Sequence, residues 1–387
     1  TSPSGYPHRI AFAARLVLGS HFARVGPANV QAAIKFRFKE SFAMHQVTHR
    51  TFRHHLFVAA VLVLALCVGS SLALAQYKAT TLVKSTGKKG DPDLINPWGL
   101  AYSPGEPFWL SDEGWGVSTL YTGTGVKQSL VVTIPPASGS GLGSPTGIVY
   151  NGSTEFQIDT WTSAFLFATL DGTISGWSHF DPNTALIAVN NSSSGAVYTG
   201  LAITSHSSGN LLYAADWWNN KIDVYDGTFQ LVNSFTDTKL PAGFVPFGIQ
   251  DINGQVYVAY ANQNEKIKGG YIDIFTEDGT FVQTLISGKP LDQPWGITLA
   301  PSNFGTLSNT LLISNNTNTG TINGFNPTTG AFVGTVETSA GKPIKINQLW
   351  GIEFGGGSSN NGNTNQLFYT AGPKNNAAGI FGVINVN

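Results

Sequence analysis

The chain has 387 residues, a formal net charge of −1 and a single cysteine, Cys67. All six arginines lie within the first 53 residues, and the part from Gln76 onward holds 13 lysines against 21 acidic residues. This acidic part, without arginine, is poorly suited to binding the phosphates of nucleic acids or of anionic lipids. With one cysteine no disulfide can form within the chain, so the fold must depend on its core.

The first 75 residues have the pattern of an upstream extension followed by a secretory signal. After Met44 come the basic residues Arg50 and Arg53, an apolar run over 56–68 and a small-residue cleavage site ending at Ala75. The run is short for a membrane span, which needs about 20 residues, although an anchor or an unusual N-terminal extension is the alternative. We expect residues 1–43 to be absent from the mature protein, 44–75 to be a signal peptide, and 76–387 to be secreted or periplasmic.

A short element organises the remaining chain. Its copies are Asn96-Pro97-Trp98-Gly99-Leu100, Ser144-Pro145-Thr146-Gly147-Ile148, Val197-Tyr198-Thr199-Gly200-Leu201, Val245-Pro246-Phe247-Gly248-Ile249, Gln293-Pro294-Trp295-Gly296-Ile297 and Gln348-Leu349-Trp350-Gly351-Ile352. The glycines are 48 to 55 residues apart. Six copies at this period indicate an array of repeated supersecondary units.

Each repeat predicts four short antiparallel strands. In the third repeat these are residues 199–204, 211–215, 221–225 and 229–235, with a tight Asp226-Gly227 turn before the last strand. The sixth repeat lacks a fourth strand, whereas residues 80–84 form a strand without a repeat of their own. The sequence therefore predicts an all-β, six-bladed β-propeller of four-stranded blades, monomeric, and closed by the N-terminal strand of the mature chain.

The glycine of the repeated element has a structural explanation. We expect the first strand of each blade to line a crowded central channel, where glycine allows neighbouring blades to approach closely. The preceding proline ends the loop without needing a ladder hydrogen bond.

Four segments carry a resemblance to known families. Residues 215–225, Ala-Asp-Trp-Trp-Asn-Asn-Lys-Ile-Asp-Val-Tyr, resemble the repeat of NHL-type propellers. With 96–100, 170–177 and 293–297, the chain from Tyr77 resembles a family of exported bacterial propellers, some of which carry a C-terminal PEP-CTERM sorting tail; this chain ends without one. The resemblance implies the fold and export, and no particular activity.

In propellers of this type, the loops from fourth to first strand and from second to third strand share the face that usually carries the site. The ligand-binding candidates on that face are Trp98, Trp115, Asp112, Asp171, Asp216, Trp217, Phe247, Trp295 and Trp350. Aromatic rings with acids and amides could hold a sugar or another flat ligand. The alternative is that the tryptophans are core residues wedged between blades.

The aspartates are also open to two interpretations. Asp112, Asp171 and Asp216 could bind Ca²⁺ or another divalent ion, with the Asp91-Pro92-Asp93 segment as a weaker candidate. An aspartate before a turn more often caps the loop through backbone N–H groups, and we favour that reading.

Histidine is scarce after residue 75. Only His179 and His206 remain, and both are expected on the face opposite the presumed site. This pattern disfavours histidine-based lyases and Ser-His-Asp hydrolases. We therefore expect a binding or protein-interaction module, for glycans or cell-surface components. The alternative is a metal-dependent hydrolase, lactonase or lyase with a carboxylate-based site at the central channel, with Asp112 and Asp216 as a possible pair.

Overall fold

A computed structural model of the protein describes residues 77–387 except 88–89 and 206–208. The expected extension and signal segment, together with Cys67 and His206, lie outside the described residues. None of the helices in the described part is long and apolar enough to cross a membrane.

The described chain forms six four-stranded antiparallel sheets. Blade 1 is β2 (Pro97–Ala101), β3 (Phe108–Asp112), β4 (Val117–Tyr121) and β5 (Lys127–Thr133); blade 2 is β6 (Pro145–Tyr150), β9 (Phe165–Thr169), β10 (Thr173–Trp177) and β11 (Leu186–Asn190); blade 3 is β12 (Tyr198–Ile203), β13 (Leu212–Asp216), β14 (Lys221–Tyr225) and β15 (Leu231–Phe235). Blade 4 is β16 (Phe244–Ile252), β17 (Gln255–Asn262), β18 (Tyr271–Thr276) and β19 (Phe281–Ser287); blade 5 is β20 (Pro294–Leu299), β21 (Leu311–Asn315), β22 (Ile322–Phe325) and β23 (Phe332–Thr335); blade 6 is β24 (Leu349–Phe354), β25 (Leu367–Ala371), β26 (Ile380–Val386) and β1 (Tyr77–Lys84).

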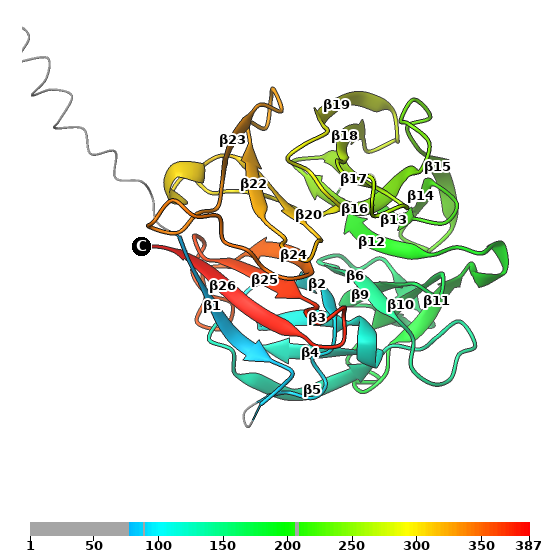
Figure 1. The fold of residues 1–387 in the computed structure, drawn as a ribbon. Coiled ribbons are helices and arrows are strands. Elements are labelled where there is room, and N and C mark those ends of the chain that lie inside the picture. The colour runs from blue at the N-terminus through cyan, green and yellow to red at the C-terminus, as the bar shows by residue number, and fades with distance from the viewer. Residues whose placement is uncertain (1–76, 88–89, 206–208) are drawn as a thin grey trace, which may run out of the picture. The chain divides into compact units, whose positions relative to one another are not determined.

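The six blades form a ring (Figure 1). The first strands contact one another in the order β2, β6, β12, β16, β20, β24 and back to β2. Each sheet thus turns its first strand toward the centre, as in a β-propeller. The prediction of a six-bladed propeller is confirmed.

The two ends of the described chain meet in one blade. β1 pairs antiparallel with β26, from Tyr77 opposite Val386 to Lys84 opposite Ile380, and the two strands lie side by side in blue and red in Figure 1. Tyr77 is buried, and its hydroxyl donates to the Phe304 carbonyl at 2.8 Å while it accepts from the Leu307 N–H at 3.0 Å. β1 is therefore attached to blade 5 as well as to its own sheet.

The repeated glycine element is a β-bulge at the start of every first strand. The pairing between first and second strands shifts register at this point in all six blades. A Cβ on Gly99 would lie 2.7 Å from the Thr146 carbonyl oxygen, and one on Gly248 would collide with the Trp295 carbonyl. The close approach of neighbouring blades therefore requires glycine, as the sequence predicted.

Hydroxyl side chains connect neighbouring blades at the bulge. Ser314 on β21 accepts from the Gly296 N–H at 2.8 Å and donates to the Trp350 carbonyl of the next blade at 2.6 Å. Thr370 on β25 repeats the arrangement between the Gly351 N–H and the Trp98 carbonyl. These buried bonds satisfy backbone groups that the bulge removes from the ladder.

Blade 2 carries an insertion between its first two strands. The segment 151–163 contains the short hairpin of β7 (Gln157–Ile158) and β8 (Trp161–Thr162), outside the blade sheet. It is anchored where the Phe156 N–H donates to the Gly227 carbonyl of blade 3 at 2.7 Å. The insertion therefore extends blade 2 over its neighbour.

Removing β1 is expected to destabilise the whole ring, because it exposes β26 and deletes the Tyr77 contacts with blade 5. We expect deletion of residues 77–86 to lower the melting temperature by at least about 10 °C. Tyr77→Phe should cost about 1–3 kcal/mol, since two buried backbone groups lose their partner. Thermal unfolding measures the effect of the deletion, and chemical denaturation measures the effect of Tyr77→Phe. The exposed Lys78→Ala is the control, and an unchanged midpoint for the deletion would contradict the expectation.

Candidate functional site

Four of the aromatic candidates form a buried cluster on the channel axis, here called the aromatic plug: Trp98, Phe247, Trp295 and Trp350. Each is at most 9% exposed. The Trp98 and Trp350 rings stack with centroids 3.6 Å apart, and Trp295 meets Trp98 edge-on at 6.1 Å. These rings pack against each other from four blades, which agrees with the alternative that the tryptophans are core residues.

Polar bonds fix the plug in place. The Trp295 indole N–H donates to the Thr199 carbonyl of blade 3 at 3.0 Å, and the Trp350 indole N–H donates to the Asn96 side-chain oxygen at 2.9 Å. Trp217 is half-buried and packs against Phe247, whereas Trp115 is 51% exposed. A role of these residues in ligand binding at this end of the channel stays a prediction. Among the candidate aromatic residues, Trp115 has the side chain most exposed to solvent.

Two of the three candidate aspartates bond to nearby loops. Asp216 accepts from the Val197 N–H and the Asn219 N–H, and Asp171 accepts from the Ser144 N–H. These contacts agree with the capping alternative. Asp112 is instead fully buried and accepts from the hydroxyl and N–H of Thr119 on β4, while burial raises its pKa well above the ordinary value.

The remaining residues that the sequence analysis discussed also have interaction partners within the chain. Asp91 and Asp93 form ion pairs with Lys127 at 2.8 and 2.6 Å. His179 packs edge-on against Trp177, after the third strand of blade 2. No group of three or more His, Cys, Asp or Glu suited to a metal ion occurs in the described part of the chain.

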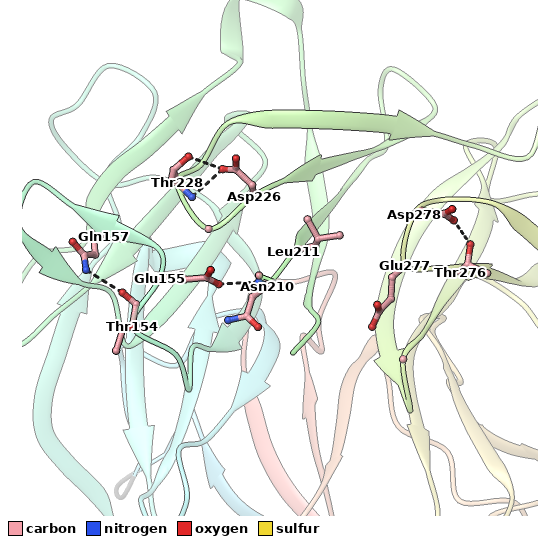
Figure 2. Close-up of a pocket in the computed structure, with 13 residues that line it drawn as sticks. Thr154, Glu155, Gln157, Asn210, Leu211, Asp226, Thr228, Thr276, Glu277 and Asp278 are labelled. Carbon is pink, nitrogen blue, oxygen red and sulfur yellow. Dashed lines mark hydrogen bonds between the residues drawn. The ribbon is translucent and has the colours of Figure 1, made fainter. Parts of the chain in front are cut away.

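A large cavity lies on the opposite face, here called the acidic cleft. It has a volume of about 1000 Å³ and is bounded by the connections from first to second and from third to fourth strands in blades 3 and 4, together with the blade 2 insertion. Its described lining is Thr154, Glu155, Gln157, Gly209, Asn210, Leu211, Asp226, Gly227, Thr228, Gly254, Thr276, Glu277 and Asp278. Figure 2 shows Glu155 and Asn210 on one side, Leu211 between, and Glu277 with Asp278 on the other.

The cleft is strongly acidic. Four carboxylates line it, and its described lining contains neither lysine nor histidine. The Asp226 and Asp278 side chains each hold their own turn, Asp226 through Thr228 and Asp278 through Thr276. Hydrogen bonds from Thr276 and Thr280 lower the pKa of Asp278, so this carboxyl stays ionised. The cleft therefore presents a concentrated negative field to solvent.

A second cavity of about 290 Å³ lies where the first strands end around the channel, and is here called the channel cavity. Its polar lining includes Glu353 on β24, Gln250 and Asp251 on β16, and Tyr102 after β2. A constriction lined by the glycines of the bulges and by Trp295 lies farther along the channel. The plug and the channel cavity thus occupy opposite ends of the channel.

The acids of the channel cavity have raised pKa values. Burial raises the pKa of Glu353 to about 7, although the Phe354 N–H donates to it. Burial and the charge of Glu277 raise the pKa of Asp251 to about 6, against a hydrogen bond from the Gly254 N–H. Burial and the charge of Glu353 raise the pKa of Tyr102 to about 12. Glu277 lines the acidic cleft, and its charge raises the pKa of Asp251 in the channel cavity. The two cavities are therefore electrostatically coupled at the turn that follows Asp251.

These acids are not among the candidates predicted from the sequence, which belong to the other face. A signal was present, since Glu353 follows the Gly-Ile pair of the sixth element where the first three elements have Ala101, Val149 and Ala202. The fourth element likewise has Gln250 there, followed by Asp251. Glu353 is the one charged residue among the six copies at this position, three of which are small or apolar, and this departure from the repeat pattern is the signal.

Comparison with known proteins gives a family by sequence. The chain is 32% identical over 340 residues to uncharacterized protein R648 of Acanthamoeba polyphaga mimivirus, covering 82% of each chain. It is 30% identical to uncharacterized protein L690 of the same virus, over 73% of this chain and 80% of that one. The chain belongs to the family of these mimivirus proteins. No family model matches it.

Solved structures share the fold at low identity. A protein of unknown function from Bacteroides thetaiotaomicron has a TM-score of 0.54 at 13% identity, covering 80% of this chain and 76% of that one. The soluble aldose sugar dehydrogenase of Escherichia coli has a TM-score of 0.52 at 12% identity, covering 80% and 100%. An inactive virginiamycin B lyase from Staphylococcus aureus, solved with quinupristin, has a TM-score of 0.50 at 13% identity, covering 81% and 100%. At these identities the likeness concerns the fold alone.

The plug leads to a prediction about stability. Trp350→Ala should lower the free energy of unfolding by about 3–5 kcal/mol, because it leaves a cavity between three aromatic neighbours. Denaturant unfolding measures this change. The exposed Trp218→Ala is the matched control and should change stability by less than about 0.5 kcal/mol. Equal effects of the two substitutions would contradict the assignment of Trp350 to the core.

Proposed function

We propose that this protein is a ligand-binding or interaction module that uses the acidic cleft to hold a cationic partner. The observation that carries the proposal is a cavity of about 1000 Å³ lined by four carboxylates, with no lysine or histidine in its described lining. Its size lies at the upper end of the range for ligand pockets. Complementary charge would attract the partner and fix its orientation.

The chemistry of the lining favours amino or guanidinium groups over neutral sugars. The described lining has no aromatic ring on which a sugar could stack, and its neutral polar groups are short hydroxyls and amides. Positively charged side chains of a protein would pair with Glu155 and Glu277 across the cleft. A Lys- or Arg-rich segment of a cell-surface protein is therefore the partner class that fits best.

Export is a further part of the proposal. It rests on the basic, apolar and small-residue pattern between Met44 and Ala75, which precedes the propeller. A secreted or periplasmic protein would be located where it can meet components of the cell surface. The membership of a bacterial exported family stays a proposal on the same grounds.

A labelled hexa-arginine peptide tests the cleft, with fluorescence anisotropy as the measurement. The double variant Glu155→Gln with Glu277→Gln should weaken binding roughly tenfold, since each lost pair contributes up to about 1 kcal/mol. Binding should also weaken with salt. It should strengthen as the pH rises through about 6, because Asp251 ionises there beside Glu277.

Glu265→Gln is the control for the peptide experiment. Glu265 is exposed and lies between β17 and β18, in a loop of the opposite face. This variant should bind the peptide as the unmodified protein does. Equal affinity of the double variant and the unmodified protein would contradict the proposal.

A second candidate function is a carboxylate-based hydrolase, lactonase or lyase in the channel cavity. The specific observation is that Glu353 and Asp251 line the same cavity and have pKa values of about 7 and about 6. Between these values Glu353 is mostly protonated and Asp251 mostly ionised. The pair would then supply a general acid and a general base at near-neutral pH.

Chromogenic aryl glycosides and lactones test this second function. The rate of hydrolysis should be highest between about pH 6 and pH 7 and fall on both sides. Glu353→Gln should lower kcat at least about 100-fold while the free energy of unfolding is retained. Glu106→Gln, an exposed acid after β2, is the control. Absence of turnover with these probes, or unchanged turnover in Glu353→Gln, would contradict this candidate.

A further inference from the structure

Two stacked aromatic rings lie exposed on blade 2, on the same face of the propeller as the acidic cleft. Trp161 belongs to β8 in the blade 2 insertion, and Phe180 belongs to the connection between β10 and β11. The ring centroids are 4.7 Å apart and the planes differ by 15°. Trp161 is nevertheless 48% exposed and Phe180 64% exposed. The stack therefore covers one face of each ring and leaves the outer faces open to solvent.

Neither ring belongs to the core of the blades. Trp161 and Phe180 are in none of the hydrophobic clusters that the buried residues form in the described part of the chain. The insertion is held by other side chains, since Phe156 is fully buried and Ile158 faces Gly176 on β10. Single exposed apolar residues need no explanation, but a stacked pair on a separate hairpin indicates contact with another molecule.

The hairpin that carries Trp161 also forms one wall of the acidic cleft. Gln157 lines the cleft, at one end of the lining in Figure 2, and is paired with Thr162, the residue next to Trp161. Trp161 is paired with Ile158, so its ring lies on the other face of the same two-stranded hairpin. A peptide that leaves the cleft over the edge of this hairpin would reach the rings within a few residues.

The charge around the pair favours a cationic ligand. Asp159 is at the tip of the hairpin and Asp181 follows Phe180, so carboxylates flank both rings in the chain. His179 turns toward the buried Trp177, with which it makes an edge-on contact. Residues 128–220, which span all of blade 2, contain no lysine or arginine and five acids: Glu155, Asp159, Asp171, Asp181 and Asp216. The face of an aromatic ring attracts a cation, and tryptophan does so best.

We propose that Trp161 and Phe180 form a cation–π subsite that selects arginine in the partner of the acidic cleft. The inference rests on the proposed function and specifies the basic side chain that the partner carries. A guanidinium group is planar and stacks on an aromatic face, whereas the lysine ammonium is compact and strongly hydrated. One arginine would lie on the outer face of Trp161 while neighbouring residues of the partner pair with the carboxylates of the cleft.

A neutral sugar is the competing ligand, because sugars also stack on tryptophan. The absence of lysine and arginine from residues 128–220 gives no advantage to a neutral ligand. The same absence strengthens the attraction for a cation, since no positive side chain of this segment opposes the field of its acids. We therefore favour the cation.

Fluorescence anisotropy with labelled hexa-arginine and hexa-lysine peptides tests the selection. The unmodified protein should bind hexa-arginine about two- to fivefold more tightly than hexa-lysine, which is the range of an exposed cation–π contact. Trp161→Ala should weaken hexa-arginine binding by this factor and leave hexa-lysine binding nearly unchanged, whereas Trp161→Phe should retain part of the preference. Trp218→Ala, at an exposed tryptophan in the turn between β13 and β14 on the opposite face, is the control and should bind both peptides as the unmodified protein does.

The variants separate this inference from the proposed function. If Glu155→Gln with Glu277→Gln weakens binding but Trp161→Ala keeps the arginine preference, the subsite is overturned and the cleft stands. If Trp161→Ala removes the preference but the double variant binds as the unmodified protein does, the subsite stands and the cleft falls. Equal affinity of the unmodified protein for the two peptides also overturns the subsite. Binding of maltohexaose that Trp161→Ala abolishes, without an arginine preference, would assign the rings to a sugar.

Discussion

The ring depends on the contact between neighbouring first strands at the bulged glycine element. At the bulge of blade 5 the Gly296 N–H donates to the Ser314 hydroxyl of the same blade, and this hydroxyl donates to the Trp350 carbonyl of the next blade. This close approach leaves no space for a Cβ at Gly99 or Gly248. The side chain that precedes each glycine is thereby turned toward the axis, and in four blades it is a large aromatic residue.

The same element explains why the two ends of the channel differ. At the start of the first strands the residues before the glycines fill the axis, so this end is apolar and packed. At the far end the strands diverge toward Glu353 and Asp251, which are half-buried beside water-accessible space. One repeated motif therefore separates a packed, apolar end of the channel from an end that carries acidic side chains.

The fold was predictable from sequence because its determinants are local and repeated. The glycine element marks every first strand, and the alternation of apolar and polar residues over 221–225 indicates a strand, although residues 222–225 are all buried in the structure. The insertion over 151–163 was not recognised, because it occurs in one blade and has no repeat to reveal it. The functional site was harder to predict than the fold. The plug residues are of the types found in a sugar-binding rim, and only their packing against one another shows that they belong to the core.

The aromatic plug has a last consequence for traffic through the molecule. Trp98 stacks on Trp350 of the adjacent blade and meets Phe247 of the opposite blade edge-on, so the hole in the ring is a blind pit and not a tunnel. Because the plug closes the other end, a molecule that enters the channel past Glu353 must also leave past Glu353.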